Sequence, residues 1–184
     1  MGFTGKIGEY MKDLNLVGNA KEAIDFLGNH YTFNCMGCAM INHEIIPPGG
    51  FIYETNSFYL IQDPEVPIKG FLIINSKKHL KSITEFTKEE RMELIELTNI
   101  AIKALKDLGI TDEVTIIREE RSFHFHLWIF PTHTWMNKKF GKGITYIRDI
   151  FSYAIDNASK KDIEETLRTI KIVRDYVNKV NQAI

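Results

Sequence analysis

The sequence lacks long apolar runs, an excess of one charge, and more than a pair of cysteines. No stretch approaches the roughly 18 uncharged apolar residues that a transmembrane helix needs. The 184 residues carry 23 Lys and Arg against 24 Asp and Glu, so charge alone gives no reason to expect nucleic acid or an acidic membrane as a partner. The N-terminus has no apolar signal-peptide core, so we expect a cytoplasmic protein whose cysteines are reduced.

The composition is that of one globular domain, with 44% hydrophobic and 26% charged residues. We expect a single domain over residues 1–184, made of a helical N-terminal extension (1–30), a mixed core (31–136) and a helical C-terminal extension (137–184). The segment up to about Asn29 has the weak apolar periodicity of a helix, and residues 145–155 and 159–182 have a stronger one.

The core has the pattern of an α+β fold. Short aromatic and β-branched runs predict strands near residues 51–53, 58–61, 70–74, 113–117 and 123–130. Thr87 and Glu90 form a capping box that opens a long helix, which Gly109 ends. Because only one strand-to-strand connection contains a helix, we expect an antiparallel sheet of about five strands with one long packed helix.

The strand that ends near Pro131 carries the most informative pattern. Its side chains alternate, so His124, His126 and Trp128 share the face opposite the apolar one. Two imidazoles side by side on a rigid element can hold a metal ion, or can serve as a nucleophile with its helper. The alternative is an exposed sheet face that happens to carry two histidines.

Cys35 and Cys38 form a C-x2-C pair, which can chelate zinc from one tight turn. A redox pair would need a helix start after a clear strand, and the preceding segment is not a clear strand. Two unrelated cysteines are the remaining alternative. A zinc site needs two more ligands, for which the candidates are His79 and His124 and the competitors are His30 and His43.

Asp63 lies at the expected end of a strand, beside a tight loop that leads to Gly70. Its carboxylate could accept hydrogen bonds from a ribose diol. An Asp at such a place also forms turns, and on this residue alone the turn is favoured.

Together these pieces resemble the histidine-triad (HIT) superfamily of nucleotide hydrolases and transferases, over just over half of the chain. The shared order is the Cys35–Cys38 pair, a hairpin ending at Asp63, Gly70, the run Phe71 to His79, the helix-opening segment from Ile83, and the strand from His124 to Pro131. The resemblance implies a HIT-type sheet. Some zinc-bearing relatives use a comparable ligand set, which supports a structural zinc ion on Cys35, Cys38, His79 and His124.

The superfamily signature has three alternating histidines, of which the middle one is the nucleophile, and this chain has two. Either Ser122 replaces the first and His124 is the nucleophile, or Trp128 replaces the third and His126 is the nucleophile. We favour His126, because relatives often carry Pro five residues after the nucleophile, as Pro131 is here. The nucleotidyl-transferase branch also varies at the third position. The indole N–H of Trp128 would keep one donor there.

The resemblance implies hydrolysis at the α-phosphate of a dinucleoside polyphosphate or a nucleoside phosphoramidate, through a nucleotidyl-histidine intermediate on His126. Asp63 would bind the nucleotide. The usual phosphate-binding loop is replaced by residues 118–122, where Arg121 and Ser122 are the candidate substitutes. Nucleotidyl transfer to phosphate or a sugar phosphate, and a zinc-stabilised binding module without catalysis, are the alternatives. The resemblance also allows for a homodimer.

Overall fold

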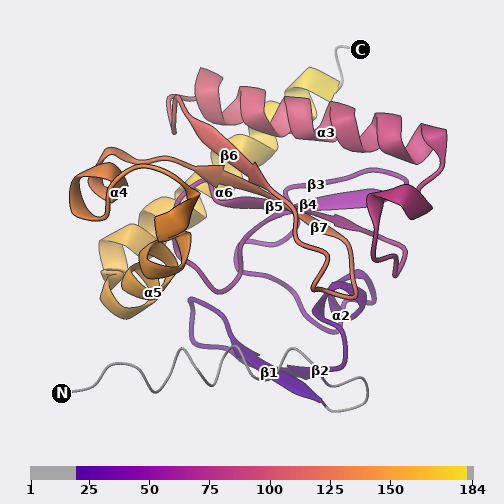
Figure 1. Ribbon diagram of the computed structural model, residues 1–184, viewed down its shortest axis with the longest axis horizontal. Helices are drawn as coiled ribbons and strands as arrows, with labels where there is room; N and C mark the ends of the chain where they lie inside the picture. The colour runs from indigo at the N-terminus through magenta and orange to yellow at the C-terminus, as the bar shows by residue number, and fades with distance from the viewer. Residues whose placement is uncertain (1–19, 182–184) are drawn as a thin grey trace.

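A computed structural model describes residues 20–181 of the chain. Its centre is a five-stranded antiparallel sheet in the order β3-β4-β5-β7-β6 (Figure 1). The strands are β3 (Tyr53–Glu54), β4 (Phe58–Gln62), β5 (Leu72–Ser76), β6 (Val114–Ile117) and β7 (His126–Pro131). The α+β fold with an antiparallel five-stranded sheet is confirmed, and β7 is inserted between β5 and β6.

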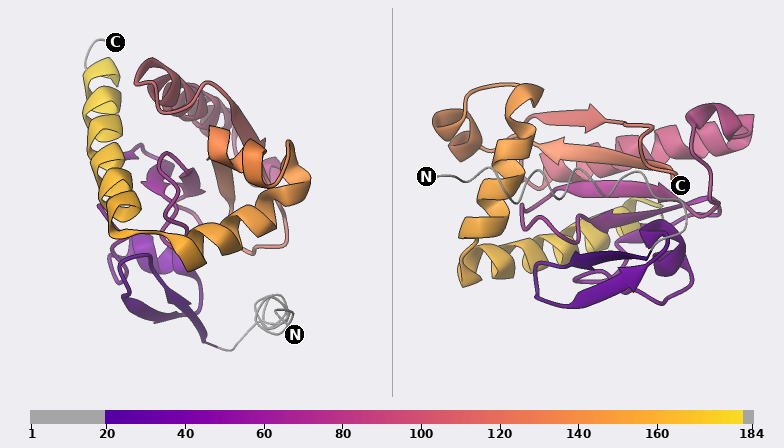
Figure 2. Two further views of the ribbon diagram at one scale, coloured as in Figure 1. Left: turned by 90° about the vertical axis from the view of Figure 1, so that its left-hand side faces the viewer. Right: turned by 60° about the horizontal axis from the view of Figure 1, so that its bottom comes forward.

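One face of the sheet is covered by two long helices, α3 (Lys88–Asp107) and α6 (Lys160–Asn181), which lie side by side (Figure 2). The expected capping box starts α3: Thr87 Oγ1 accepts from Glu90 N at 3.2 Å, and Glu90 Oε2 accepts from Thr87 N at 2.8 Å. The main core lies between this helix pair and the sheet, and it includes the fully buried Phe125 and Val173. The side chains of β7 that point this way are therefore structural.

Two smaller apolar clusters cover the opposite face of the sheet. One gathers on the short helix α2 (Met36–Ile41), and the other gathers on α4 (Thr134–Lys139) and α5 (Ile147–Asn157). The 3-10 turn η3 (Ile144–Tyr146) leads into α5. Trp128 packs against both clusters. The face that carries His126 is thus covered at its two ends by different segments of the chain.

The segment before α2 is a β-hairpin where a weak helix was expected. Its strands are β1 (Lys21–Ile24) and β2 (His30–Phe33). The carboxylate of Asp25 accounts for the difference, because Oδ1 accepts from the backbone N–H groups of Leu27 and Asn29 and closes a turn. Gly28 completes that turn at φ 86°. The rest of the expected N-terminal helix, residues 1–19, lies outside the described residues.

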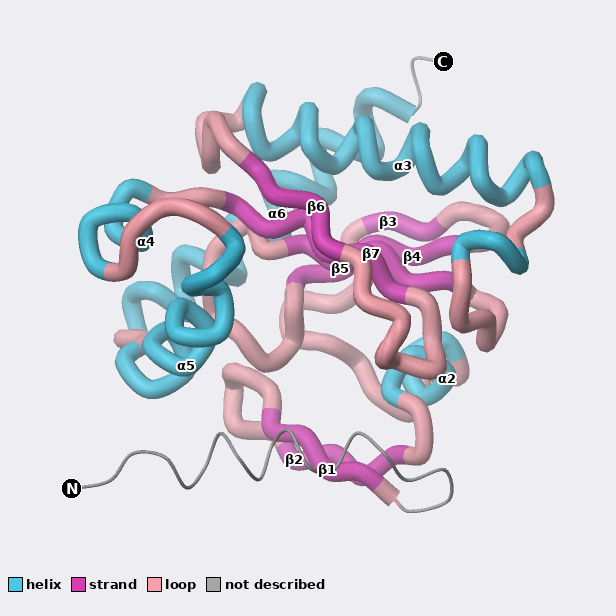
Figure 3. The backbone as a smooth tube through the Cα atoms, in the orientation of Figure 1, coloured by secondary structure: helices cyan, strands magenta, loops and turns pink. Residues whose placement is uncertain are grey.

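The C-terminal segment has the two expected helices, α5 and α6, and also the short helix α4, which the sequence pattern did not predict. Strand β7 begins at His126, three residues later than expected, and residues 118–125 form a loop that descends beside α2 (Figure 3). A short 3-10 turn, η2 (Ile83–Glu85), precedes α3. Among the described residues, no helix combines the length and apolar character needed to cross a membrane.

Candidate functional site

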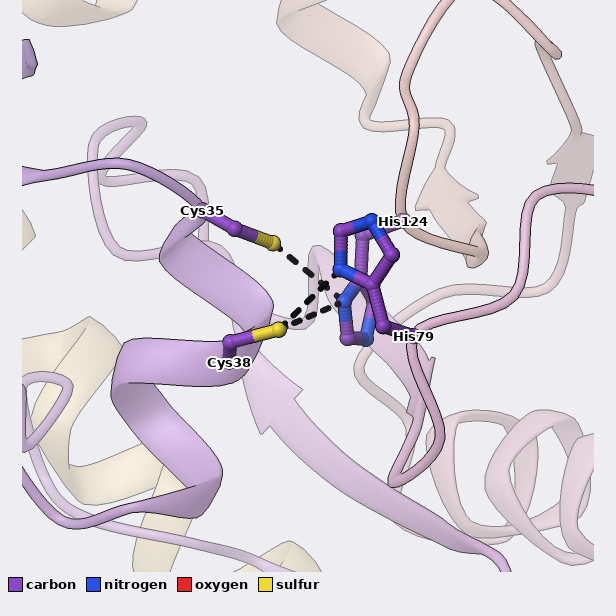
Figure 4. A group of neighbouring side chains, drawn as sticks. All are labelled: Cys35, Cys38, His79 and His124. Atoms are coloured by element: carbon purple, nitrogen blue, oxygen red, sulfur yellow. Dashed lines mark hydrogen bonds between the residues drawn. The ribbon is translucent and has the colours of Figure 1, made fainter. Parts of the chain in front are cut away.

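The structure brings Cys35, Cys38, His79 and His124 together from three separate segments (Figure 4). One potential ligand atom from each residue lies within 4.8 Å of the others. The Nδ1 atom of His124 is 3.3 Å from the sulfur of Cys35 and 3.6 Å from that of Cys38, and Nδ1 of His79 is 3.1 Å from Cys38. Tetrahedral zinc with sulfur and nitrogen ligands separates ligand atoms by roughly 3.5 Å. The cluster therefore has the composition and spacing to hold a metal ion.

The surroundings of the cluster hold His124 in place. Its Nε2 lies 2.7 Å from the backbone oxygen of Ser76, an arrangement in which Nε2–H donates and the lone pair of Nδ1 is left for a metal. Gly37 lies against the same ring, and a Cβ added there would come within 2.6 Å of it. The buried hydroxyl of Tyr59 donates to the Gly37 carbonyl at 3.1 Å. The glycine between the two cysteines is thus required by the close approach of α2 to His124.

The two thiols differ in their tendency to ionise. Burial opposes ionisation of Cys35, but its interactions with His124 and Cys38 outweigh burial and lower the pKa of Cys35 to about 6. Burial and the neighbouring Cys35 raise the pKa of Cys38 to about 11. One thiolate therefore forms readily, and a bound cation would stabilise the second.

His126 begins β7 opposite Asn75 of β5, on the sheet face that points away from α3. Its Nδ1 lies 3.2 Å from the backbone oxygen of His124, where it can donate a hydrogen bond. Burial lowers the pKa of His126 and outweighs the opposing effect of that hydrogen bond, so the imidazole is neutral at neutral pH. Within the described part of the chain, no group hydrogen-bonds to Nε2. A neutral ring with one nitrogen anchored and the other free is suited to nucleophilic attack.

A cavity of about 640 Å³ borders His126, and the metal cluster forms part of its wall. The hairpin contributes Lys21 and Phe33, and the turn after β4 contributes Asp63. The apolar part of the lining comes from α2, β4 and β5, with Met40, Ile61 and Ile73. The apolar side chains of such a cavity can pack against a planar ring, and its polar side chains can hydrogen-bond to a polar chain.

Asp63 lies at the edge of this cavity with a turn already bound to its carboxylate. Its Oδ1 accepts from the backbone N–H groups of Glu65 and Val66 at 2.9 and 2.8 Å. Burial and the charge of Glu65 raise the pKa of Asp63 to about 7, although these two hydrogen bonds oppose the rise. Both hydrogen bonds are to Oδ1, so Asp63 stabilises the turn through this oxygen, and Oδ2 is available to a ligand.

Trp128 is packed between His126 and helix α5. Its ring centroid is 5.6 Å from that of His126 and 5.5 Å from that of Phe151. Phe71, the residue after Gly70, meets the indole edge-on at 5.8 Å. Among described residues, none accepts a hydrogen bond from the indole N–H. Trp128 therefore attaches the C-terminal extension to the sheet as well as facing the cavity.

The loop between β6 and β7 places the two candidate phosphate ligands differently. Ser122 borders the cavity, and its hydroxyl exchanges hydrogen bonds with the backbone of His124. Arg121 is half-exposed and forms an ion pair with Glu119 at 2.5 Å, outside the cavity lining. The two competing histidines, His30 and His43, are not part of the metal cluster.

The comparisons with known proteins give a fold match alone. No family model matches the sequence, and no curated protein matches it significantly. The structure is similar to a zinc-bound histidine triad family protein from Mycobacterium smegmatis, with 16% identity, a TM-score of 0.57 and coverage of 82% of this chain and 97% of that one. A hypothetical histidine triad nucleotide-binding protein from Sulfolobus tokodaii strain7 gives 22% identity, a TM-score of 0.58, and coverage of 82% and 96%. This chain has the histidine-triad fold.

A third structure with the histidine-triad fold, a HIT family protein from Bacillus anthracis str. 'Ames Ancestor', gives 19% identity, a TM-score of 0.51, and coverage of 82% and 97%. The covered share exceeds the span from Cys35 to Pro131 that carries the sequence resemblance. The structural likeness therefore reaches beyond the segment whose motifs could be recognised.

Several residues at this site had no sequence signal. Lys21 enters the cavity from a hairpin that was expected to be helical. Arg148 of α5 reaches the ring of Trp128, and the carboxylate of Glu119 lies beside it. A second cavity of about 840 Å³ is lined by residues of α4, α5 and α6, and His133 is its only histidine among the described residues. The tertiary positions of the hairpin and of α5 decide these contacts.

Proposed function

We propose that the protein is a nucleotide phosphohydrolase that acts at an α-phosphate through a nucleotidyl-histidine intermediate on His126. The observation that carries this proposal is the state of His126: a neutral, half-buried imidazole, fixed by the His124 carbonyl, at the edge of a cavity with apolar walls. The histidine-triad fold supports the same chemistry, since one similar structure is described as a nucleotide-binding protein.

In the first step, Nε2 of His126 attacks the α-phosphorus. A nitrogen–phosphorus bond forms, the bond from phosphorus to the leaving group breaks, and the leaving group departs with the electron pair; a phosphoramidate nitrogen takes up a proton from solvent as it leaves. Water then attacks the same phosphorus, the nitrogen–phosphorus bond breaks, and the electron pair returns to Nε2. The proton of that water passes to solvent, and a nucleoside monophosphate is released.

The cavity contains groups suited to the remainder of a nucleotide. Met40, Ile61 and Ile73 form an apolar wall for a base, and Oδ2 of Asp63 would accept from the ribose hydroxyls. The indole N–H of Trp128 would donate to a phosphate oxygen, and the Ser122 hydroxyl would do so by turning away from the His124 carbonyl to which it donates. The fixed donors would meet charge that develops during the transfer.

We further propose that the metal of the cluster is zinc in a structural role. Two thiolates and two neutral imidazoles fill a tetrahedral site and leave no open position for substrate, so zinc would supply stability rather than Lewis-acid chemistry. The similarity to a zinc-bound protein of the same fold supports this assignment.

The proposed function is tested by incubating the zinc-loaded protein with diadenosine tetraphosphate and with adenosine phosphoramidate, and by measuring AMP. The wild type should release AMP, and His126→Ala should lower the rate by more than roughly 1,000-fold. His30→Ala, an exposed histidine on the hairpin, is the matched control and should keep the wild-type rate. Intact-mass analysis of a rapidly quenched reaction should show one added nucleotidyl group in the wild type and none in His126→Ala.

The same assay separates the alternatives. ADP formed in the presence of inorganic phosphate would identify a nucleotidyl transferase. Nucleotide binding without any AMP would identify a non-catalytic module. A His124→Ala variant that keeps its metal but loses turnover, with His126→Ala active, would show that the nucleophile had been assigned two residues too late.

A further inference from the structure

Two arginines share one carboxylate beside Trp128. The Nη2 atom of Arg121 is 2.5 Å from Oε2 of Glu119, and the Nη2 atom of Arg148 is 3.3 Å from the same oxygen. The three side chains are between 37% and 51% exposed. One carboxylate cannot neutralise two guanidinium groups, so this cluster has an excess positive charge and is open to solvent.

The position of Arg148 is fixed by the packing of α5 on Trp128. The guanidinium carbon lies 5.7 Å from the centroid of the indole ring. Phe151, one helical turn further on, contacts the same indole at 5.5 Å and stacks on Phe71 at 5.2 Å. Residues three apart share one face of a helix, so α5 docks on Trp128 through both side chains.

The arginine pair lies across Trp128 from the proposed nucleophile. The ring of Trp128 is 5.6 Å from that of His126, and Arg148 lies on the α5 side of the indole. Glu119 lies two residues after Ile117, the residue that pairs with Trp128 in the sheet, and its charge acts on His126. The positive charge is thus further from His126 than the phosphorus under attack would be. Additional phosphates in a chain could span that separation.

The other charged residues of the loop are engaged elsewhere. Arg118 donates to the backbone oxygen of Lys81 and lies over the ring of Phe125, whose side chain belongs to the α3 face. Glu120 accepts from the hydroxyl of Ser82 at 2.7 Å. Glu120 therefore does not contribute to the charge beside Trp128, whereas Arg118 adds positive charge close to Glu119 and His126.

We infer that Arg148, together with Arg121, binds phosphates of the leaving group, so the substrates are nucleotides or dinucleotides with a polyphosphate chain rather than nucleoside phosphoramidates. This inference rests on the proposed function. Guanidinium groups at this place would stabilise the negative charge that collects on the leaving phosphate oxygen as its bond to the α-phosphorus breaks. Glu119 holds the two arginines until the phosphates replace it. The C-terminal extension would thereby supply cationic charge on the side of the site where the third histidine of the signature is missing.

The test compares two substrates that differ in the charge of the leaving group, in zinc-loaded full-length protein. Diadenosine tetraphosphate releases a nucleoside polyphosphate, and adenosine phosphoramidate releases uncharged ammonia. Arg148→Ala should lower kcat/KM for the tetraphosphate by roughly 10- to 100-fold and change that for the phosphoramidate by less than about threefold. Arg148→Lys should recover part of the loss. Arg168→Ala, an exposed arginine on α6, is the matched control and should leave both values unchanged.

An equal loss with both substrates, or no loss with either, would overturn the inference and leave the proposed function standing. If the wild type cleaves neither substrate, the proposed function fails, and calorimetry decides the inference separately. Inorganic tripolyphosphate should then bind the wild type at least about tenfold more tightly than it binds Arg148→Ala, and Arg168→Ala should match the wild type. Equal binding to all three proteins would overturn it in that case too.

Discussion

His124 of the metal cluster lies in the loop before β7, and His126 and Trp128 lie on β7 itself, so the two regions are neighbours. They differ in how their side chains are held. In the cluster every side chain has a partner inside the cluster, and a close-packed glycine and a backbone carbonyl hold His124. On the other surface, His126 is anchored by a single backbone bond and faces a cavity. The first arrangement holds segments of the chain together, and the second leaves room for a ligand to approach.

The difference also separates what the two neighbouring histidines do. His124 uses Nδ1 toward the sulfurs and Nε2 toward the Ser76 carbonyl, so both ring nitrogens are committed. His126 commits only Nδ1. A histidine whose nitrogens are both engaged cannot be the nucleophile, which favours His126 in that role.

The largest effect that distinguishes the two regions should come from loss of the metal. Cys38→Ser should abolish binding of one zinc ion per chain and lower the free energy of unfolding by at least about 4 kcal/mol, because the site joins three segments and so closes two long loops. Metal analysis and thermal unfolding of freshly purified protein measure both effects. His79→Ala should behave like Cys38→Ser, whereas His30→Ala should keep the metal. A zinc-free wild type of unchanged stability would contradict the structural role.

The next largest effect is a pH dependence of the unfolding free energy that comes from Asp63. This residue is buried at the cavity and does not belong to the metal cluster. Its pKa is raised to about 7 by burial, so the folded state binds this proton more tightly than the unfolded chain does. The associated stability is present at acidic pH and is lost as the pH rises through about 7. From pH 5 to pH 8, the wild type should lose roughly 2–3 kcal/mol of unfolding free energy relative to Asp63→Asn.

Denaturant unfolding at the two pH values measures this effect, and Asp175→Asn, at an exposed position on α6, is the control. Parallel pH dependence in the wild type and Asp63→Asn would mean that the carboxyl group is already ionised at pH 5. Ligand binding then tests the other role of the residue. AMP should bind more tightly than dAMP by about 1–3 kcal/mol if Oδ2 accepts from the ribose hydroxyls.

Gly37 tests how tightly α2 is fitted to the cluster. Gly37→Ala should lower the free energy of unfolding by about 1–3 kcal/mol and weaken zinc binding, because the added methyl group meets the His124 ring. Gly109→Ala is the control: its φ of 64° strains an alanine, but nothing lies near the added atom. Both variants should lose stability, and only Gly37→Ala should lose zinc affinity in a competition titration. Unchanged affinity would mean that α2 can shift.

The sequence predicted the antiparallel sheet of about five strands, the capped long helix and the four residues of the metal cluster, but not the insertion of β7 between β5 and β6. Each of these depends on local chemistry: alternation, a capping box, or residue types that have few other uses at such spacing. The hairpin at 21–33 was missed because its signal is one carboxylate, Asp25, which closes a turn inside a weakly periodic segment. Helix α4 was missed because six residues do not establish a period.

The arrangement around Trp128 could not be predicted for a different reason. Periodicity correctly indicated helices in the C-terminal extension, but it does not say where a helix docks. Arg148 reaches the indole only because Phe151 stacks on Phe71, a contact between residues 80 positions apart in the sequence. The metal cluster was easier to predict, because a pair of cysteines indicates a metal site and the resemblance to zinc-bearing relatives favoured His79 and His124 over His30 and His43.

The smallest effect concerns the indole N–H of Trp128, and it tests whether the open surface depends on a donor or on packing. Trp128→Phe keeps an aromatic ring against Phe71, Phe151 and Arg148 but removes the N–H. If that donor contacts a phosphate oxygen, turnover of diadenosine tetraphosphate should fall by about tenfold, with a change in unfolding free energy of less than about 1 kcal/mol. Trp128→His restores the three-histidine pattern but removes the indole ring against which Phe151 and Arg148 of α5 pack. Trp128→His should therefore raise the turnover of adenosine phosphoramidate and at the same time lower the free energy of unfolding. Wild-type turnover in Trp128→Phe would show that the indole serves packing alone, and that the donors come from Ser122 and the arginines on its far side.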